Sequence, residues 1–208
     1  MTSTHAPRSA APVDPGPAAR PRGLAWLLVI GGLIGLASSL ALTLEKFAKL
    51  DDPGYVPSCS LNPVVSCGSV MDSAQAALFG FPNPLIGLMT FPVVVTAGAA
   101  ILGGYRAPRW FWLGMQLGTT LAVVFIHWLV VQSLYSIGAL CPYCMIVWVV
   151  TIAIFWYTTL HNLKADHLGG GRSVGVALGR FHSVVLVVWY LVIVVLILQR
   201  FWDYWSSL

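Results

Sequence analysis

The residues with the clearest capacity for chemistry are four cysteines, which fall into two pairs. Cys141 and Cys144 enclose a Pro-Tyr dipeptide, whereas seven residues separate Cys59 from Cys67. The stabilisation that a disulfide provides grows with the length of the loop it closes, so a bridge across a dipeptide stabilises the fold very little. CxxC pairs are instead common in redox chemistry. The spacing therefore favours thiol–disulfide exchange, and two structural disulfides remain the alternative.

The CxxC motif stands where a long apolar run begins. Pro142 suits the first position of a helix, where its missing N–H costs nothing. Cys141 is then near the N-cap and Cys144 in the first turn, where unpaired backbone N–H groups and the helix dipole favour a thiolate. We expect this pair to be anchored at the membrane surface, with a thiolate available for exchange.

The other pair lies in a more polar stretch. Cys67 comes just before residues 69–79, which predict a short helix with capping-box-like spacing between Ser69 and Asp72. Cys59 lies in a segment flanked by prolines, which we interpret as flexible. The sequence therefore predicts that Cys59 and Cys67 form a mobile and exposed pair.

The elements that hold these cysteines have the composition of a membrane protein. Hydrophobic residues make up 58% of the chain and charged residues 9%, and the mean hydropathy is +0.81. A helix that crosses the bilayer needs about 20 mostly apolar residues. Five runs are expected to span the membrane, at 24–44, 84–104, 110–135, 142–160 and 184–202. Residues 36–41 resemble a signal-peptide cleavage region only faintly, so we interpret the first run as an uncleaved helix.

The distribution of basic residues predicts the orientation of these helices. An odd number of spans places the termini on opposite sides, and eight Lys and Arg then share the side of the N-terminus while three lie on the other. The positive-inside bias puts the N-terminus in the cytoplasm and the C-terminus outside the cell membrane. Because these basic residues form no stripe on one face, nucleic acid is not expected as a partner.

In this orientation all four cysteines are external. Thiols in this oxidising compartment do not stay reduced by default, and an even number of cysteines allows all four to pair. CxxC is also a spacing of zinc ligands, but the wider second pair and the oxidising compartment disfavour zinc, so no metal is predicted. No predicted span carries an acidic or basic residue at its middle, which disfavours ion transport.

The chain divides into four parts in this interpretation. The first is rich in Ala, Pro and Ser and has nothing apolar enough to pack, so it is expected to be disordered. The parts are a cytoplasmic tail at 1–23, four spans at 24–160 with an external loop at 45–83, a cytoplasmic loop at 161–183, and a fifth helix with a short external C-terminus at 184–208.

These motifs resemble the vitamin K epoxide reductase family, in particular its bacterial members that act in disulfide formation. The resemblance covers roughly residues 24–160 and rests on two cysteine pairs in this order. The matching positions are Cys59, Ser66, Cys67, Val70, Ser73, Asn83, Gly87, Cys141 and Cys144. The family implies an all-α integral membrane protein with a four-helix transmembrane bundle around a quinone, either menaquinone or ubiquinone. A fifth transmembrane helix and a short helix in the external loop are expected in addition.

The resemblance also implies what each cysteine does. Cys59 exchanges with an external partner, Cys67 attacks Cys141, and Cys144 faces the quinone. The implied partner is a DsbA-like thiol oxidase with a thioredoxin fold, which must be reoxidised after each reaction before it can act again. Some bacterial members carry a thioredoxin-like domain after a fifth helix, whereas this chain ends at Leu208, so we expect the partner to be a separate protein.

Three further residues are candidate quinone contacts. Asn83 matches a family asparagine that hydrogen-bonds a quinone carbonyl, and its alternative role is a helix cap beside Pro84. Trp148 stands where vertebrate members carry a quinone-contacting tyrosine, and its indole N–H can donate instead. His127 lies inside the third span, where it passes a proton to the quinone or, alternatively, forms an interhelical hydrogen bond.

The predicted function is therefore reoxidation of the external thiol oxidase, with the electrons passing through both cysteine pairs to a membrane quinone. One alternative is a quinone or quinone-epoxide reductase that uses the same cysteines. The other is a non-enzymatic membrane scaffold with two structural disulfides, in which Cys141→Ser should leave external disulfide formation intact.

Overall fold

The computed structural model describes residues 21–207 of the chain. Most of the predicted cytoplasmic tail, residues 1–20, lies outside this range, and the first helix already begins at Arg22. Five helices in the described part are long and apolar enough to cross a membrane, which confirms the predicted number. They are α1 (Arg22–Asp51), α3 (Pro84–Leu102), α4 (Arg109–Val131, continued by the π-helical turn η2, Gln132–Ile137), α5 (Pro142–Lys164) and α7 (His182–Arg200).

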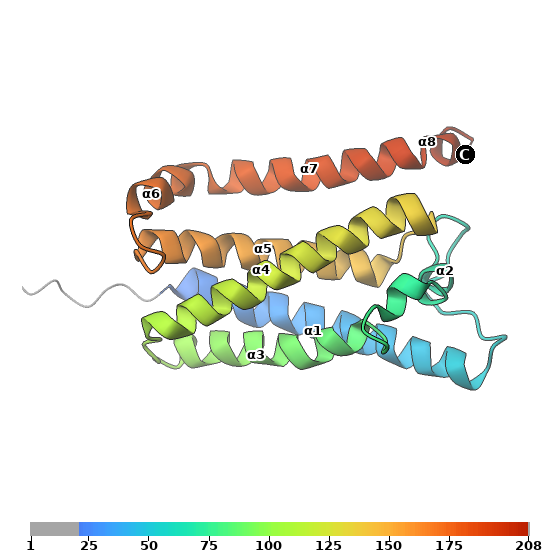
Figure 1. The fold of residues 1–208 in the computed structure, drawn as a ribbon, viewed down its shortest axis with the longest axis horizontal. Coiled ribbons are helices and arrows are strands. Elements are labelled where there is room, and N and C mark those ends of the chain that lie inside the picture. The colour runs from blue at the N-terminus through green and yellow to red at the C-terminus, as the bar shows by residue number, and fades with distance from the viewer. Residues whose placement is uncertain (1–20, 208) are drawn as a thin grey trace, which may run out of the picture.

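The first four long helices form a bundle, and α7 runs along its outer side (Figure 1). Within the bundle, α1 packs against α3 and α5, and α4 packs against α5. No residue of α7 is fully buried, because this helix contacts the others along one side only. Four short helices complete the described chain. They are α2 (Cys67–Met71), the 3-10 helix η1 (Ala74–Ala77), α6 (Arg172–Arg180) and α8 (Trp202–Ser206).

The largest differences from the predicted boundaries are at the end of α1 and in residues 161–183. Helix α1 continues to Asp51, well beyond the predicted end at residue 44, because Lys46 and Lys49 hold its last polar turns against α2 and the residue that follows α2. An apolar run predicts where a helix is surrounded by lipid, not where its backbone hydrogen bonds stop. The external loop therefore begins at residue 52. Residues 161–183, predicted as a loop, contain the end of α5 and the whole of α6.

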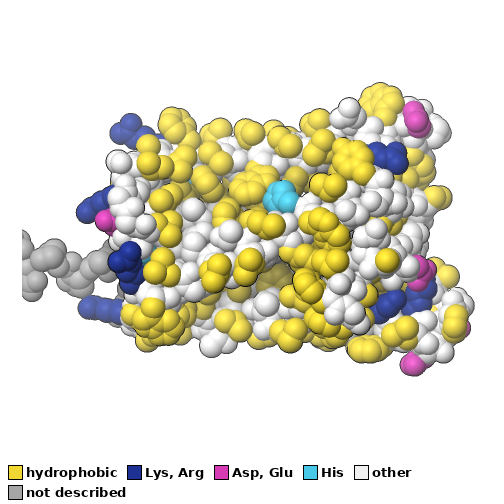
Figure 2. Space-filling model, in the orientation of Figure 1, with side chains coloured by type: hydrophobic (Ala, Val, Ile, Leu, Met, Phe, Trp, Pro, Cys, Tyr) yellow, Lys and Arg dark blue, Asp and Glu magenta, His cyan; other side chains and the backbone are white. Residues whose placement is uncertain are grey.

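The surface has the distribution of side chains that a bilayer requires. Figure 2 shows hydrophobic side chains along the length of the molecule and charged side chains gathered at its two ends. Large apolar residues such as Leu121, Val188 and Leu191 are exposed. An apolar surface of this extent is stable in lipid rather than in water. The chain is therefore a helical membrane protein, as the sequence predicts.

Candidate redox site

The four cysteines meet at one end of the bundle, which we call the cysteine end. Cys67 is the first residue of α2, and Ser66 caps this helix by accepting a hydrogen bond from the Ser69 N–H (3.2 Å). Cys141 is the N-cap of α5, and its Sγ accepts a hydrogen bond from the Cys144 N–H (3.4 Å). The predicted start of a helix at the CxxC motif is confirmed.

The short helix predicted at residues 69–79 is wrong in its boundaries. The segment folds as α2, which already starts at Cys67, and as the separate 3-10 helix η1. Ser66 takes the capping position instead of Ser69, because Ser66 has the extended backbone conformation of an N-cap. The Asp72 carboxylate does not complete a capping box but pairs with Lys49 of α1 (2.5 Å).

Two short backbone segments bring the cysteine pairs together. Val65 and Leu140 form a parallel β-bridge, in which the Ser66 N–H donates to the Leu140 carbonyl at 2.8 Å. The Leu140 N–H donates in turn to the carbonyl of the residue before Val65 (2.7 Å). Cys67 and Cys141 directly follow these hydrogen-bonded residues. Their Sγ atoms are 3.2 Å apart, although the two residues are 74 positions apart in the sequence.

The two pairs are in different redox states. Cys59 and Cys67 form a disulfide, whereas Cys141 and Cys144 are free thiols. The 3.2 Å between the Sγ atoms of Cys67 and Cys141 falls in the range of about 3–3.5 Å in which reacting atoms are poised. The arrangement suits exchange between the Cys141 thiolate and the Cys67 sulfur, in either direction.

The surroundings of Cys141 favour its thiolate form. A hydrogen bond from the Cys144 thiol lowers the pKa of Cys141, and the backbone N–H groups of Tyr143 and Cys144 act in the same direction. Together these donors outweigh burial, which opposes them. The sulfur that is closest to the disulfide is thus also the one prepared to act as a nucleophile.

The Cys59–Cys67 disulfide is buried, so the prediction of an exposed pair is wrong. The exposed fraction is 7% for Cys59 and 0% for Cys67. Part of the cover comes from α1, whose Leu42 belongs to the same buried apolar cluster as this pair. Glu45 also accepts hydrogen bonds from Ser58, next to Cys59. Of the two sulfurs, Cys59 lies closer to the surface.

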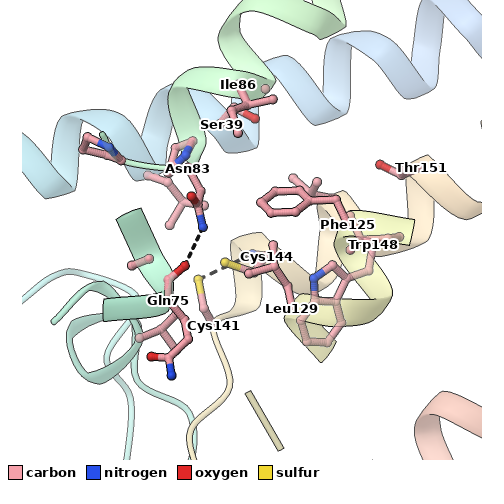
Figure 3. A pocket seen from close by; sticks show the side chains of 18 of the residues that line it. Ser39, Gln75, Asn83, Ile86, Phe125, Leu129, Cys141, Cys144, Trp148 and Thr151 are labelled. Atoms are coloured by element: carbon pink, nitrogen blue, oxygen red, sulfur yellow. Dashed lines mark hydrogen bonds between the residues drawn. The ribbon is translucent and has the colours of Figure 1, made fainter. Parts of the chain in front are cut away.

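A cavity of about 540 Å³ lies beside the CxxC motif and has the size of a small-molecule site. Cys141 and Cys144 form part of its wall together with side chains from the surrounding helices (Figure 3). Most of the wall is apolar. Its other polar members are Ser39, Lys46, Ser73, Gln75, Asn83, Thr90, Ser133 and Thr151. Within the described chain, Lys46 is the one charged residue of this wall.

Asn83 lies in the cavity wall and ties two elements together. Its Nδ2 donates to the Gln75 carbonyl (2.7 Å), and its Oδ1 accepts from the Leu78 N–H (3.2 Å). Figure 3 shows the Asn83 amide pointing toward Gln75 on one side of Cys144. Asn83 occupies the N-cap position of α3 directly before Pro84, as the alternative predicts, but its side chain makes no capping hydrogen bond. The amide carries a second N–H that is available to a ligand.

Trp148 also forms part of the cavity wall, on the other side of Cys144 from Asn83 (Figure 3). Its side chain is buried, with an exposed fraction of 3%, and Phe125 of α4 also lines the cavity. This position brings an aromatic ring and an indole N–H to the same space as the CxxC pair.

His127 does not lie in the cavity wall, and the structure does not bring it to the cysteines. Its Nε2 accepts a hydrogen bond from the Trp189 indole N–H of α7 (2.9 Å). Its Nδ1 lies 2.7 Å from the Val123 carbonyl and donates to it in the matching tautomer. Both ring nitrogens are therefore engaged between α4 and α7. The interhelical alternative describes His127, and the predicted proton transfer to a quinone has no geometric support.

The sequence reasoning missed several polar residues of the cavity wall. Lys46 follows Leu42 by one helical turn, so a helix continued past Leu44 would have placed both on one face. The prediction ended this helix too early. Gln75 lies in η1, a 3-10 helix without a periodic signal in the sequence.

These features define a helical membrane protein in which a disulfide and a CxxC pair are in contact beside a cavity. A comparison with known families finds that the model of the vitamin K epoxide reductase family matches residues 26–159. A comparison with curated proteins finds no match. Because the family match covers well over half of the chain, the chain belongs to the vitamin K epoxide reductase family and is a membrane redox protein. Helices α6, α7 and α8 lie outside the matched region.

Proposed function

We propose that this protein reoxidises an external DsbA-like thiol oxidase and passes the electrons through its two cysteine pairs to a membrane quinone. This activity would support disulfide formation in exported proteins. The observation that carries the proposal is the 3.2 Å separation of the Cys67 and Cys141 sulfurs, with a cavity whose wall includes the CxxC pair. The contact connects the loop disulfide to the cavity without any other redox group.

The first half of the cycle reduces the loop pair. A thiolate of the reduced partner attacks Cys59, the more accessible sulfur of the disulfide, and Cys67 leaves as a thiolate. The second thiol of the partner then attacks the partner's own sulfur in the mixed disulfide and releases Cys59. The partner leaves oxidised, and two electrons now reside on Cys59 and Cys67.

The second half moves these electrons inward. Cys67 attacks Cys141 of an oxidised CxxC pair, Cys144 leaves as a thiolate, and Cys59 then attacks Cys67 to release Cys141. The result is a loop disulfide beside a CxxC dithiol, which is the state that the structure has. The low pKa of Cys141 makes it a good leaving group in this last step.

The cavity fits a quinone ring by its mostly apolar wall and by its contact with Cys141 and Cys144. A bound quinone would accept two electrons and two protons from the dithiol, chemistry that no side chain here supplies. Asn83 and Trp148 line this cavity, and we propose that they orient the ring by hydrogen bonding. The proposed quinone is menaquinone or ubiquinone.

The orientation we propose places the cysteine end outside the cell membrane. Basic residues of the described chain are more numerous at the opposite end, as the positive-inside bias predicts for a cytoplasmic face. They are Arg22, Arg106, Arg109, Lys164, Arg172 and Arg180, against Lys46, Lys49 and Arg200 at the cysteine end. Labelling of single cysteines with a membrane-impermeant maleimide in whole cells tests this orientation, and protection of Cys59 by the membrane would contradict it.

Trapping of the partner tests the function. In Cys67→Ala, Cys59 is a free thiol whose thiolate attacks the disulfide of the partner in its oxidised form, and one partner sulfur leaves as a thiolate. Because Cys67 is absent and cannot release Cys59, we expect a mixed disulfide between Cys59 and a soluble thioredoxin-fold protein. The control Cys59→Ser/Cys67→Ala should give no adduct. Deletion of the gene should also cause exported proteins to accumulate in reduced form. Unchanged thiol status with an altered quinone pool would instead favour the quinone reductase alternative.

A further inference from the structure

The C-terminal helices lie outside the family match, yet α7 contacts η2, the turn that leads into the Cys141 segment. Helix α7 is attached to the bundle midway by two hydrogen bonds. They join Trp189 to His127 of α4 and the Tyr190 hydroxyl to the Val149 carbonyl of α5 (2.8 Å). The remaining contacts of interest are at the end of α7 that reaches the cysteine end.

The first of these contacts is made by Arg200, the last residue of α7. Its Nε donates a hydrogen bond to the Leu134 carbonyl of η2 (2.8 Å). Leu134 is fully buried, and η2 is a π-helical turn, a conformation that is rare and costly without external support. Gly138, with φ of 68°, ends η2 and directs the chain toward Leu140. Arg200 thus holds the turn from which the Cys141 segment departs.

The second contact is made by Phe201, which is buried with an exposed fraction of 7%. Its ring belongs to one apolar cluster with Val64, Leu134 and Leu140. Val64 and Leu140 are hydrogen-bonded to each other in the β-bridge that precedes Cys67 and Cys141. Phe201 therefore belongs to the same buried apolar cluster as both segments of the bridge.

We infer that Arg200 and Phe201 are positioning residues for electron exchange between Cys67 and Cys141. The bridge consists of two backbone hydrogen bonds, and so small a pairing is marginal without side-chain packing behind it. A displacement of about 1 Å between reacting groups slows a reaction on the order of 100-fold. The fifth transmembrane helix accordingly keeps the two sulfurs in contact, and does not serve merely as an anchor. Which thiols donate the electrons and which molecule accepts them rests on the proposed function. The contact between the Cys67 and Cys141 sulfurs does not.

A disulfide cross-link measures this positioning without a partner or a quinone. In full-length protein with Cys59→Ser and Cys144→Ser, only Cys67 and Cys141 remain. Oxidised glutathione converts the two thiols to a disulfide and is itself reduced to two glutathione molecules. We expect Arg200→Gln to slow this cross-link about 10-fold to 100-fold. Arg200→Lys, which keeps a cationic donor, should restore much of the rate, and Arg180→Gln in α6 should leave it unchanged.

A second readout separates positioning from general destabilisation. With Cys59→Ser and Cys67→Ser, dithiothreitol reduces the CxxC pair directly, and reduction of a short-chain quinone reports the remaining steps. Arg200→Gln should leave this rate within about twofold of its parent. An unchanged cross-linking rate in Arg200→Gln would overturn the inference, as would a parallel loss of both readouts with a lower unfolding temperature. Failure of quinone reduction in the parent would refute the proposed acceptor but leave the cross-linking result intact.

Discussion

Lys46 and Lys49 offer a matched pair of substitutions at the cysteine end. Both lysines lie on the last turns of α1, and both hold the α2 region, Lys46 through the Met71 carbonyl and Lys49 through Asp72. They differ in that Lys46 forms part of the cavity wall and Lys49 does not. Replacing either lysine with Met removes one polar contact to the α2 region. Only Lys46→Met also removes the charge of the cavity wall.

The structure gives different expected magnitudes for the two changes. The Lys46 ammonium makes a partly buried hydrogen bond of 2.9 Å to Met71, and bonds of this charged type contribute about 1.5–3 kcal/mol. The Lys49–Asp72 pair is more exposed, with 17% and 58% of the side chains accessible, and such pairs contribute about 0.2–1 kcal/mol. We expect the free energy of unfolding to fall by about 2 kcal/mol in Lys46→Met and by less than about 1 kcal/mol in Lys49→Met.

Loss of the cavity charge should also slow the chemistry. A cation in a cavity of low dielectric stabilises a thiolate and any negative charge that develops on a bound acceptor. A loss of only about 1.4 kcal/mol of this stabilisation lowers the rate tenfold. We therefore expect quinone reduction at least about tenfold slower in Lys46→Met, an unchanged rate in Lys49→Met, and a largely restored rate in Lys46→Arg.

The assay is a single turnover under anaerobic conditions. Purified protein is reduced with dithiothreitol, freed of excess reductant and mixed with a short-chain quinone, whose absorbance is followed. Denaturant unfolding in the same detergent gives the stabilities. Equal rates and equal stabilities for Lys46→Met and Lys49→Met would refute the reasoning, because the cavity position of Lys46 would then have no consequence.

Three further outcomes follow from the site. Because the Cys144 thiol lowers the pKa of Cys141, the Cys141 thiolate persists to lower pH. In a variant whose loop cysteines are both alanine, Cys144→Ala should therefore shift the pH profile of iodoacetamide labelling of Cys141 to higher pH. An unmoved profile would contradict that cause. Asn83→Ala removes one hydrogen bond to η1 and one to Leu78, which follows η1, and should lower the free energy of unfolding by about 1–3 kcal/mol. It should also raise the KM for quinone, and wild-type values for both quantities would contradict the assigned position of Asn83. Trp189→Phe leaves His127 without its interhelical donor and should cost about 0.6 kcal/mol of stability, with the rate of quinone reduction unchanged, and a large loss of rate would return His127 to the mechanism.

The sequence was sufficient for features that depend on local physics. The number of spanning helices follows from the length of apolar runs, and the helix start at Cys141 follows from a cysteine and a proline in N-cap and first-turn positions. The order and spacing of the cysteine pairs was enough to predict the family, which the match over residues 26–159 confirms.

Features that depend on which helix faces which were predicted poorly. Periodicity is weak in a helix that is apolar on all sides, so it did not show that His127 faces α7 or that Asn83 binds η1. The extension of α1 by polar turns, and with it the burial of Cys59, depends on partners in α2 and the loop that no apolar run predicts.

The sequence by itself determined the set of spanning helices and the two cysteine pairs, because each of these features depends on residues that are close together in the sequence. Only the tertiary structure decided that Cys67 and Cys141 touch, that one pair is bridged beside a free one, and that a cavity adjoins them. The reason is that a contact between residues 74 positions apart depends on the packing of α4, α5, α7 and a two-bond β-bridge, which no local pattern encodes.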